Sequence, residues 1–479
     1  MNAAIAGIPT TIYLGADIKG DVVFDNADAA LITIEGCGHE YDGTITITDN
    51  TDIEFVGVNF ASESATSFIN VVGDGLARLN QHTSLFVDGC SFEGNDATTA
   101  AIVANEGSIT VKNSTIEGCE NGLELDGAKM VKVENTTIEV ENDGICVDGS
   151  VDGFSLTLKD NEITANQPLV VCNLTGNGEI ELSGENTLTT EAEYQIVLTN
   201  GACDEKAMPT GTYTLTGADG YTVYDGWVKV AKWDEFTAAL AANAEGIKLT
   251  GDVVNATSYT INQNVIIDLN GKTFELTNAS AILYTGIDKN NTNTPNVTIK
   301  NGYINNIVYG LSGDLNLTDI VFGGTVTYLD AAQGVINTKY ANLLAVNCKM
   351  TNVKKEGSTK PRTISVEGRS SGYIRLIDCN LSKSGVLDRA YFWTIGGTTI
   401  LELKNCVLFN TLQASNIELS GTYSWTNMDI SGCKGGFTFG IGRASTSLTE
   451  EELAIYKAIK KNNSGSMRFI FSDGEKNNL

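Results

Sequence analysis

One short pattern of apolar and polar residues recurs along the first half of the sequence. Four segments carry it, LFVDGCSF, ITVKNSTI, VKVENTTI and LTLKDNEI, which begin at residues 85, 109, 131 and 156. Each is followed by a second short apolar segment, near residues 100, 122, 144 and 168. A repeat of this length cannot bury its own apolar face, so neighbouring repeats must stack to make a core.

The second half follows the same logic with wider spacing. An Asn or Asp stands three residues before an apolar residue at six places: Asn301, Asp319, Asn347, Asp378, Asn405 and Asn427. The uneven steps predict loops of different length around a constant stacked core.

This pattern resembles the right-handed parallel β-helix of the pectate-lyase-like superfamily, across most of residues 10–440. The resemblance implies an all-β fold and concerns the fold alone, not a catalytic motif. Lyases, hydrolases, adhesins and viral spikes all use this fold, so it does not by itself decide the function.

Three of the second-half corners are Asn-Cys or Asp-Cys pairs. In a stack of coils, equivalent residues lie about 4.8 Å apart, so we predict a hydrogen-bonded ladder of Asn347, Asp378 and Asn405. The Cys residues that follow are predicted to form a second, inward column of packed, reduced thiols, and disulfides or a nucleophile are the alternatives. These are Cys348, Cys379 and Cys406.

The start of the repeat is written twice, at residues 12–47 and again at 247–276, which predicts two tandem β-helical modules with short capping helices. We expect a first module at 1–226, a second at 227–445 with a capping helix at 232–244, and a helix and strand at 446–479. Thr449 and Glu452 make a capping box for that last helix. The first module lacks such a cap, so a partner chain, an N-terminal plug or further sequence is expected to cover it.

The balance of 59 acidic against 31 basic residues gives a net charge of −28. This field repels phosphate backbones and anionic lipids, so nucleic acid is not an expected partner. The sequence has no stretch of about eighteen consecutive apolar residues, so we expect no membrane insertion. The N-terminus does not resemble a secretory signal; either a signal has been removed, or the protein is assembled without export, as virion proteins are.

Candidate catalytic groups are sparse. The resemblance implies that a polygalacturonase-like site would need Asn-Thr-Asp, Asp-Asp, Gly-His-Gly and Arg-Ile-Lys, and only residues 50–52 match. His39 and His82 are predicted turn or surface residues. Asp143, Asp148 and Asp152 are predicted turn residues, with Ca²⁺ binding as the alternative. We therefore predict no catalytic residues, no metal site and no cofactor.

A basic run at 352–375 stands out in this acidic chain. Lys354, Lys355, Lys360, Arg362 and Arg369 are candidates to bind an anionic glycan or an acidic partner. A solvated loop beside the stack is the alternative that we favour.

These observations favour a non-enzymatic structural or attachment protein, most of all a phage fibre or decoration protein of a virion. A bacterial cell-surface adhesin is one alternative, and a polysaccharide lyase or glycoside hydrolase of the β-helix class is another. The expected partners are proteins, further copies of the chain (a trimer among the options) or a cell-surface glycan, and the expected location is the virion or the cell surface.

Overall fold

Parallel strand pairing dominates the computed structural model, which divides into two compact units, Met1–Gly226 and Trp227–Leu479. The structure describes residues 8–25, 30–48, 52–72, 83–95, 97–203, 206–211, 213–278, 281–287, 294–323, 325–327, 334–350, 354–356, 362–366, 371–381, 389–395, 397–407, 417–420, 423–435, 437–443, 445, 447–465, 467–471 and 476–477.

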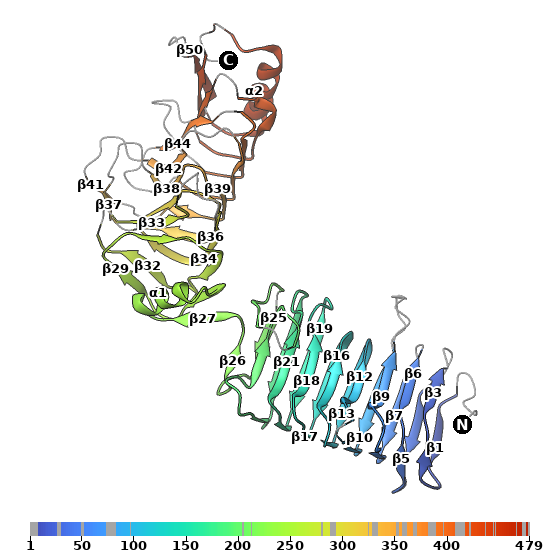
Figure 1. Ribbon diagram of the computed structural model, residues 1–479. Coiled ribbons are helices and arrows are strands. Elements are labelled where there is room, and N and C mark those ends of the chain that lie inside the picture. Colours follow the sequence, from blue (N-terminus) through green and yellow to red (C-terminus); the bar gives the residue numbers. More distant parts are fainter. Residues whose placement is uncertain are drawn as a thin grey trace. The chain divides into compact units, whose positions relative to one another are not determined.

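The first unit contains three parallel sheets, A, B and C, and the chain visits them in turn, so that each strand pairs with its counterpart one coil later (Figure 1). Sheet A contains β1 (Thr10–Tyr13), β4 (Ile32–Glu35), β7 (Asp52–Val56), β10 (Ser84–Asp88), β13 (Gly107–Lys112), β16 (Ala128–Glu134), β19 (Phe154–Lys159), β22 (Gly178–Ser183) and β25 (Tyr213–Thr216). Sheet B contains β2 (Ile18–Lys19), β5 (Glu40–Asp42), β8 (Asn59–Ala61), β11 (Ser91–Glu93), β14 (Thr115–Glu117), β17 (Thr137–Glu139), β20 (Glu162–Thr164) and β23 (Thr187–Thr189). Sheet C contains β3 (Val22–Asp25), β6 (Ile45–Thr48), β9 (Ser67–Val72), β12 (Ala100–Ala104), β15 (Asn121–Leu125), β18 (Asp143–Asp148), β21 (Gln167–Cys172), β24 (Ile196–Leu198) and β26 (Val223–Tyr224).

The second unit is built in the same way around sheets D and E and a short pair of strands, β37 (Thr325–Thr327) and β41 (Lys354–Glu356). Sheet D contains β27 (Trp227–Val230), β28 (Gly246–Leu249), β29 (Val253–Asn255), β31 (Val265–Asp268), β32 (Thr273–Leu276), β34 (Asn296–Asn305), β36 (Asp314–Phe322), β39 (Asn342–Val346), β40 (Lys349–Met350), β43 (Tyr373–Ile377), β45 (Ile400–Lys404) and β47 (Met428–Ser431). Sheet E contains β30 (Tyr259–Ile261), β33 (Ile282–Thr285), β35 (Ile307–Gly310), β38 (Gly334–Thr338), β42 (Arg362–Val366), β44 (Arg389–Ile395), β46 (Ile417–Ser420), β48 (Phe437–Gly442), β49 (Met467–Phe471) and β50 (Lys476–Asn477).

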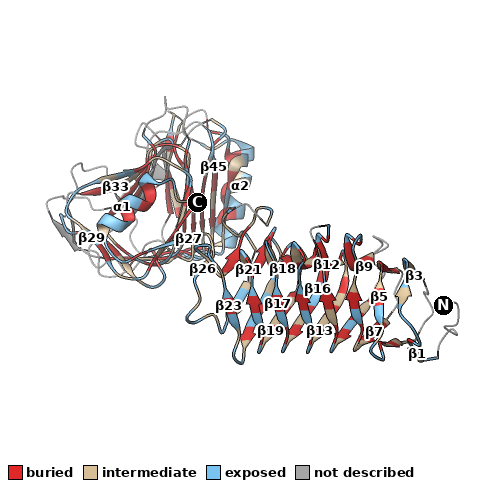
Figure 2. Cartoon of the chain, turned by 60° about the horizontal axis from the view of Figure 1, so that its bottom comes forward, coloured by how far each residue is buried: buried red, intermediate tan, exposed pale blue. Residues whose placement is uncertain are grey.

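Alternation of apolar and polar residues decides which side chains enter the core of each unit. In a strand, successive side chains point to opposite faces. Buried and more exposed residues accordingly alternate along the strands of the first unit (Figure 2), and the buried ones are mostly apolar. One column of buried residues runs through sheet A of the first unit: Ile53, Leu85, Ile109, Val131, Leu156 and Ile180.

The corner after most sheet A strands is made by one residue in the left-handed backbone conformation. Asn113, Asn135 and Asp160 occupy it with φ of 49°, 50° and 55°. Asn and Asp tolerate this conformation better than other non-glycine residues. The Asn135 amide donates to Asn113 Oδ1 at 2.8 Å, and the Asn113 amide donates to Asp88 Oδ1 at 2.7 Å, so the corners are tied coil to coil.

At several corners the next residue points inward and accepts a backbone N–H from the preceding coil. The Cys90 N–H donates to Ser114 Oγ at 3.2 Å, and the Thr136 N–H donates to Asn161 Oδ1 at 3.0 Å. Ser114, Thr136 and Asn161 are all buried, so an apolar side chain at the accepting position would leave a buried N–H without a partner. The polar side chains at these positions are therefore explained by their hydrogen bonds to the buried backbone.

One predicted corner was wrong. The corner after Asn405 is Gly432, with φ of 66°, and Asn427 instead ends the 3-10 helix Trp425–Asn427. The register of β45 with β47 pairs Lys404 with Ser431, which places Gly432 beside Asn405. Glycine adopts this conformation without a side-chain penalty, so the corner is real although the Asn pattern is missing.

Two helices cover parts of the second unit. Helix α1 (Trp233–Ala241) buries Phe236 and Leu240 against the first coil, where Phe236 and Phe274 lie 5.3 Å apart between ring centroids. Helix α2 (Glu450–Asn462) packs on the last coils through Tyr456, whose ring contacts Phe469. The predicted capping box is present, with Thr449 and Glu452 each accepting the other's backbone N–H.

We predict that Asn135→Val destabilises the first unit more than Asn135→Gly. Valine loses the amide hydrogen bond and also resists the left-handed corner, so its free energy of unfolding should fall by about 2–3 kcal/mol. Glycine loses only the hydrogen bond and should cost about 1 kcal/mol. Urea unfolding followed by circular dichroism measures both variants, and equal losses would contradict the role assigned to the corner.

Candidate functional site

The predicted ladder residues of the second unit lie at equivalent corners of successive coils. Asn347, Asp378 and Asn405 have φ of 50°, 55° and 53°. The Asn405 amide donates to Asp378 Oδ1 at 3.0 Å, and the Asn347 amide donates to Asp319 Oδ1 at 2.5 Å. These side chains are used in joining the coils.

The thiols that follow these corners form a buried column. Cys348, Cys379 and Cys406 donate to backbone carbonyls of the preceding coil, those of Leu317, Ala345 and Leu376, at 3.5, 3.3 and 3.3 Å. Cys433 extends the column, because its Sγ accepts the Cys406 N–H at 3.4 Å and its own N–H donates to Asn463 Oδ1 at 2.7 Å.

The environment of this column keeps its thiols protonated. The neighbouring Cys348 thiol, followed by burial, raises the pKa of Cys379 to about 12. The Cys379 thiol, again followed by burial, raises the pKa of Cys406 to about 12. A thiol acts as a nucleophile through its thiolate, so these two groups are poorly suited to covalent catalysis near neutral pH.

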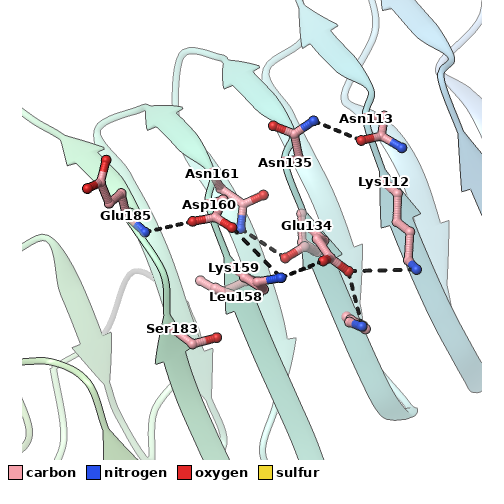
Figure 3. A network of polar contacts seen from close by, with 12 residues as sticks. Lys112, Asn113, Glu134, Asn135, Leu158, Lys159, Asp160, Asn161, Ser183 and Glu185 are labelled. Atoms are coloured by element: carbon pink, nitrogen blue, oxygen red, sulfur yellow. Dashed lines mark hydrogen bonds and ion pairs between the residues drawn. The ribbon is translucent and has the colours of Figure 1, made fainter.

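A second column, on the outer face of sheet A, alternates positive and negative charges (Figure 3). Glu134 lies between Lys112 and Lys159, with the Lys159 ammonium 3.0 Å and the Lys132 ammonium 3.1 Å from its carboxylate. Lys112 is 3.7 Å away. Hydrogen bonds from Lys159 and Lys132 lower the pKa of Glu134 to about 2. The charges of this column are therefore largely neutralised within the molecule.

A third column is acidic and lines a hollow at the turn between sheets B and C, which we call the glutamate groove. Glu93, Glu117 and Glu139 occupy the same register position in β11, β14 and β17 and are all exposed. The groove has a volume of about 590 Å³ and is lined by Glu93, Gly94, Asn95, Glu117, Gly118, Cys119, Glu139, Val140 and Glu141.

Glycine at the base of the glutamate groove leaves no side chain to fill it. A Cβ atom on Gly94 would lie 2.6 Å from Cys119 Sγ, so a side chain there would displace the buried thiol beneath the groove. No Lys or Arg of the described residues forms an ion pair with Glu93, Glu117 or Glu139. Like charges stacked at strand spacing repel one another, so the groove concentrates negative potential.

Carboxylates also gather on the outer face of sheet C. Glu124 lies near the end of β15, Asp126 follows that strand, and Asp148 ends β18. Burial raises the pKa of Glu124, although the Asn121 amide donates to Glu124 Oε1 at 2.6 Å. Burial and then the Asp148 charge raise the pKa of Asp126. Raised carboxyl pKa values are one requirement of a general acid.

The other candidate acids and histidines have structural partners. Asp148 Oδ1 accepts the Ser150 N–H at 2.7 Å, and Asp152 Oδ1 accepts the Asn177 amide at 2.7 Å. Asp143 begins β18, the strand that Asp148 ends, so the three acids do not converge on one point. His39 Nδ1 lies 3.2 Å from Asp17 Oδ1 at the surface.

Several candidates fall outside the described residues: Asn50, Thr51 and His82, with Lys360 and Arg369 of the basic run. Asp52 of the Asn-Thr-Asp match is described, and its Oδ1 accepts the Ser84 N–H at 3.1 Å. Lys354 and Lys355 lie in β41 and Arg362 in β42, where the structure describes the strands but not these side chains. The basic run thus remains a prediction.

Cys146 and Cys203 form a disulfide that was not predicted from the sequence. The two residues are 57 positions apart in the sequence. Cys146 lies on the outer face of sheet C, and Cys203 lies in the loop after β24 that packs over this face. Neither spacing nor repeat alignment predicts that contact.

The glutamate groove was also missed. Its signal is present in the aligned repeats as FEG, IEG and IEV, where an acid follows the second buried residue after each corner. Alignment of exposed positions, as well as buried ones, would have identified this column.

The sequence comparison agrees with this architecture. Residues 20–191 match the family described as right handed beta helix region. No curated protein matches the chain. Together with the stacked parallel sheets of both units, the match identifies the fold as a right-handed parallel β-helix. Neither helix of the described residues is long and apolar enough to cross a membrane.

We predict that the thiol column resists modification in the folded protein. At pH 8 an aromatic disulfide reagent should label Cys37, which is exposed, while Cys379 and Cys406 react only after unfolding. Mass spectrometry of labelled peptides identifies the sites. Rapid native labelling of Cys379 would contradict the buried column.

We predict an acid-sensitive contribution from Glu134. Its lowered pKa means that the ion pairs are intact above the ordinary glutamate pKa of 4.5 and are lost as the pH falls towards about 2. Carboxyl-carbon NMR should show Glu134 titrating near pH 2. Glu134→Gln should flatten the loss of stability between these pH values, and Glu181→Gln, on the same sheet face, should not.

Proposed function

We propose that this right-handed parallel β-helix is a non-enzymatic attachment protein that binds a partner protein through the glutamate groove of its first unit. The observation that carries the proposal is the column Glu93, Glu117 and Glu139, three identical acids in register without internal counter-ions among the described residues. The neighbouring Lys112, Glu134 and Lys159 column has its charges paired, so the exposed charge of the groove is the exception.

The shape of the groove favours an extended ligand. Equivalent carboxylates recur at strand spacing along the stack, about 4.8 Å apart, and such an array suits a polypeptide segment or surface with several positive charges in a row. A repeated array of one group gives multiple similar contacts. A catalytic centre, by contrast, needs groups with different roles and different pKa values.

The charge of the whole chain supports the same partner chemistry. A net charge of −28 accelerates the encounter with a cationic surface and slows the approach of other anions. Anionic glycans therefore fit the glutamate groove less well than a basic protein, unless divalent cations such as Ca²⁺ bridge the two.

The Cys146–Cys203 disulfide supports a location outside the reducing cytosol. We propose the surface of a bacterial cell or a released virion, where a fibre or decoration protein would stand. Binding of a partner protein through exposed, repeated acids is compatible with either location.

Replacing two groove acids should weaken binding of a cationic probe. We predict that Glu117→Gln with Glu139→Gln lowers the affinity for an oligolysine peptide about tenfold at low salt, because two exposed ion pairs are lost at about 0.7 kcal/mol each. Isothermal titration calorimetry at two ionic strengths measures the loss.

The matched control is Glu179→Gln with Glu181→Gln, which removes the same charge from the exposed face of sheet A. This variant should retain nearly full affinity. Equal weakening by both double variants would show that the peptide responds to net charge, and the glutamate groove would lose its assigned role.

A polysaccharide-degrading enzyme is the second candidate, and the acids of sheet C are the observation that favours it. Glu124, near the end of β15, and Asp126, which follows that strand, both have raised pKa values. Release of reducing ends or unsaturated products from acidic polysaccharides tests this candidate. Turnover that disappears in Glu124→Gln and persists in Glu179→Gln would reverse the ranking of the two functions.

A further inference from the structure

Three cysteines meet on the outer face of sheet C, away from the glutamate column. The Sγ atoms of Cys146, Cys172 and Cys203 all lie within 4.8 Å of one another. Cys146 is 5% exposed and Cys172 is 3% exposed, so two of the three thiols are enclosed. They pack with Val170 and Val197 beneath Tyr194 and Tyr224, which form a small apolar cluster outside the main core.

The spacing of these sulfur atoms suits a shared metal ion. With a zinc–sulfur distance of about 2.3 Å, two thiolates of a tetrahedral site lie about 3.8 Å apart. Cys146 Sγ and Cys172 Sγ are 3.8 Å apart. The Cα atoms of Cys146 and Cys203 are 6.9 Å apart, just above the usual range for a disulfide, whereas a bridging ion spans such a separation readily.

The charges around the cluster favour a cation. The carboxylates of Asp148, Asp126 and Asp143 place negative charge near Cys172. This negative charge attracts a divalent ion, which displaces the thiol protons when it binds. One positive group lies on the outer side, where Lys206 Nζ is 4.5 Å from the centre of the Tyr194 ring.

We infer that Cys146, Cys172 and Cys203 form a redox-gated site for a thiophilic divalent ion such as Zn²⁺. In the oxidised protein the Cys146–Cys203 bond withholds two ligands, and Cys172 remains a single buried thiol. Reduction supplies three sulfur ligands at one place, and solvent or another nearby oxygen can complete the coordination.

Each step balances. A dithiol reductant gives two electrons and two protons to the Cys146–Cys203 bond, which becomes two thiols, while the reductant closes its own disulfide. The ion then replaces three thiol protons, which pass to solvent, and the resulting tris-thiolate centre carries one negative charge. Metal affinity should therefore increase with pH.

The test uses the full-length chain and Cd²⁺, whose bonds to thiolates absorb in the ultraviolet. The protein is reduced with a water-soluble phosphine, which is removed under anaerobic conditions before titration. We expect one Cd²⁺ per chain with a thiolate charge-transfer band, competition by Zn²⁺, and neither binding nor band in the oxidised protein.

Cys172→Ser should abolish this stoichiometric binding while still forming the Cys146–Cys203 disulfide when oxidised, which shows that the variant folds. Cys119→Ser, which removes another buried thiol of the first unit, should bind like the parent. Failure of the reduced parent to bind Cd²⁺, or unchanged binding by Cys172→Ser, would overturn the site. Equal binding by oxidised and reduced parent protein would overturn the gating.

Discussion

The buried backbone N–H at each corner is the constraint on which the rest of the stack depends. The chain must change direction within one left-handed residue, and the next residue then points into a core that excludes water. An unpaired N–H there would cost about 1–3 kcal/mol at each such corner. The side chain of the following coil removes that cost, through Ser114, Asn161 or Cys433. The stacking register and the residue type that follows each such corner therefore depend on each other.

This requirement explains how much of the molecule could be predicted from sequence. The Asn-Cys and Asp-Cys pairs predict the repeat and the inward column, because the corner accepts few residue types. The handedness was predicted from the resemblance to known parallel β-helices. Gly432 makes the same turn without the Asn signal, so the last corner was placed at Asn427. The Cys146–Cys203 bond joins a strand to a loop from a later coil, and a pattern of local repeats carries no information about such a contact.

The residue types at exposed positions meet different requirements from those at buried positions. On sheet A, lysines and Glu134 alternate and neutralise one another, which suits a surface that only has to hold its shape. In the glutamate groove the same register position is acidic in three coils, and no ion pair among the described residues relieves the repulsion. Because the scaffold is the same in both places, the difference reflects the side chains chosen for each column. Sequence patterns of apolar residues cannot distinguish these two columns, since both alternate in the same way.

The parallel ladders within each unit also have a mechanical consequence. Hydrogen bonds between coils point along the stack, and several strands join each coil to the next. Tension spread over a whole end coil in that direction is therefore shared by all ladders of a layer at once. Bonds loaded together resist force far better than bonds opened one after another, so a unit pulled over its whole end coil resists extension better than one pulled by its chain end.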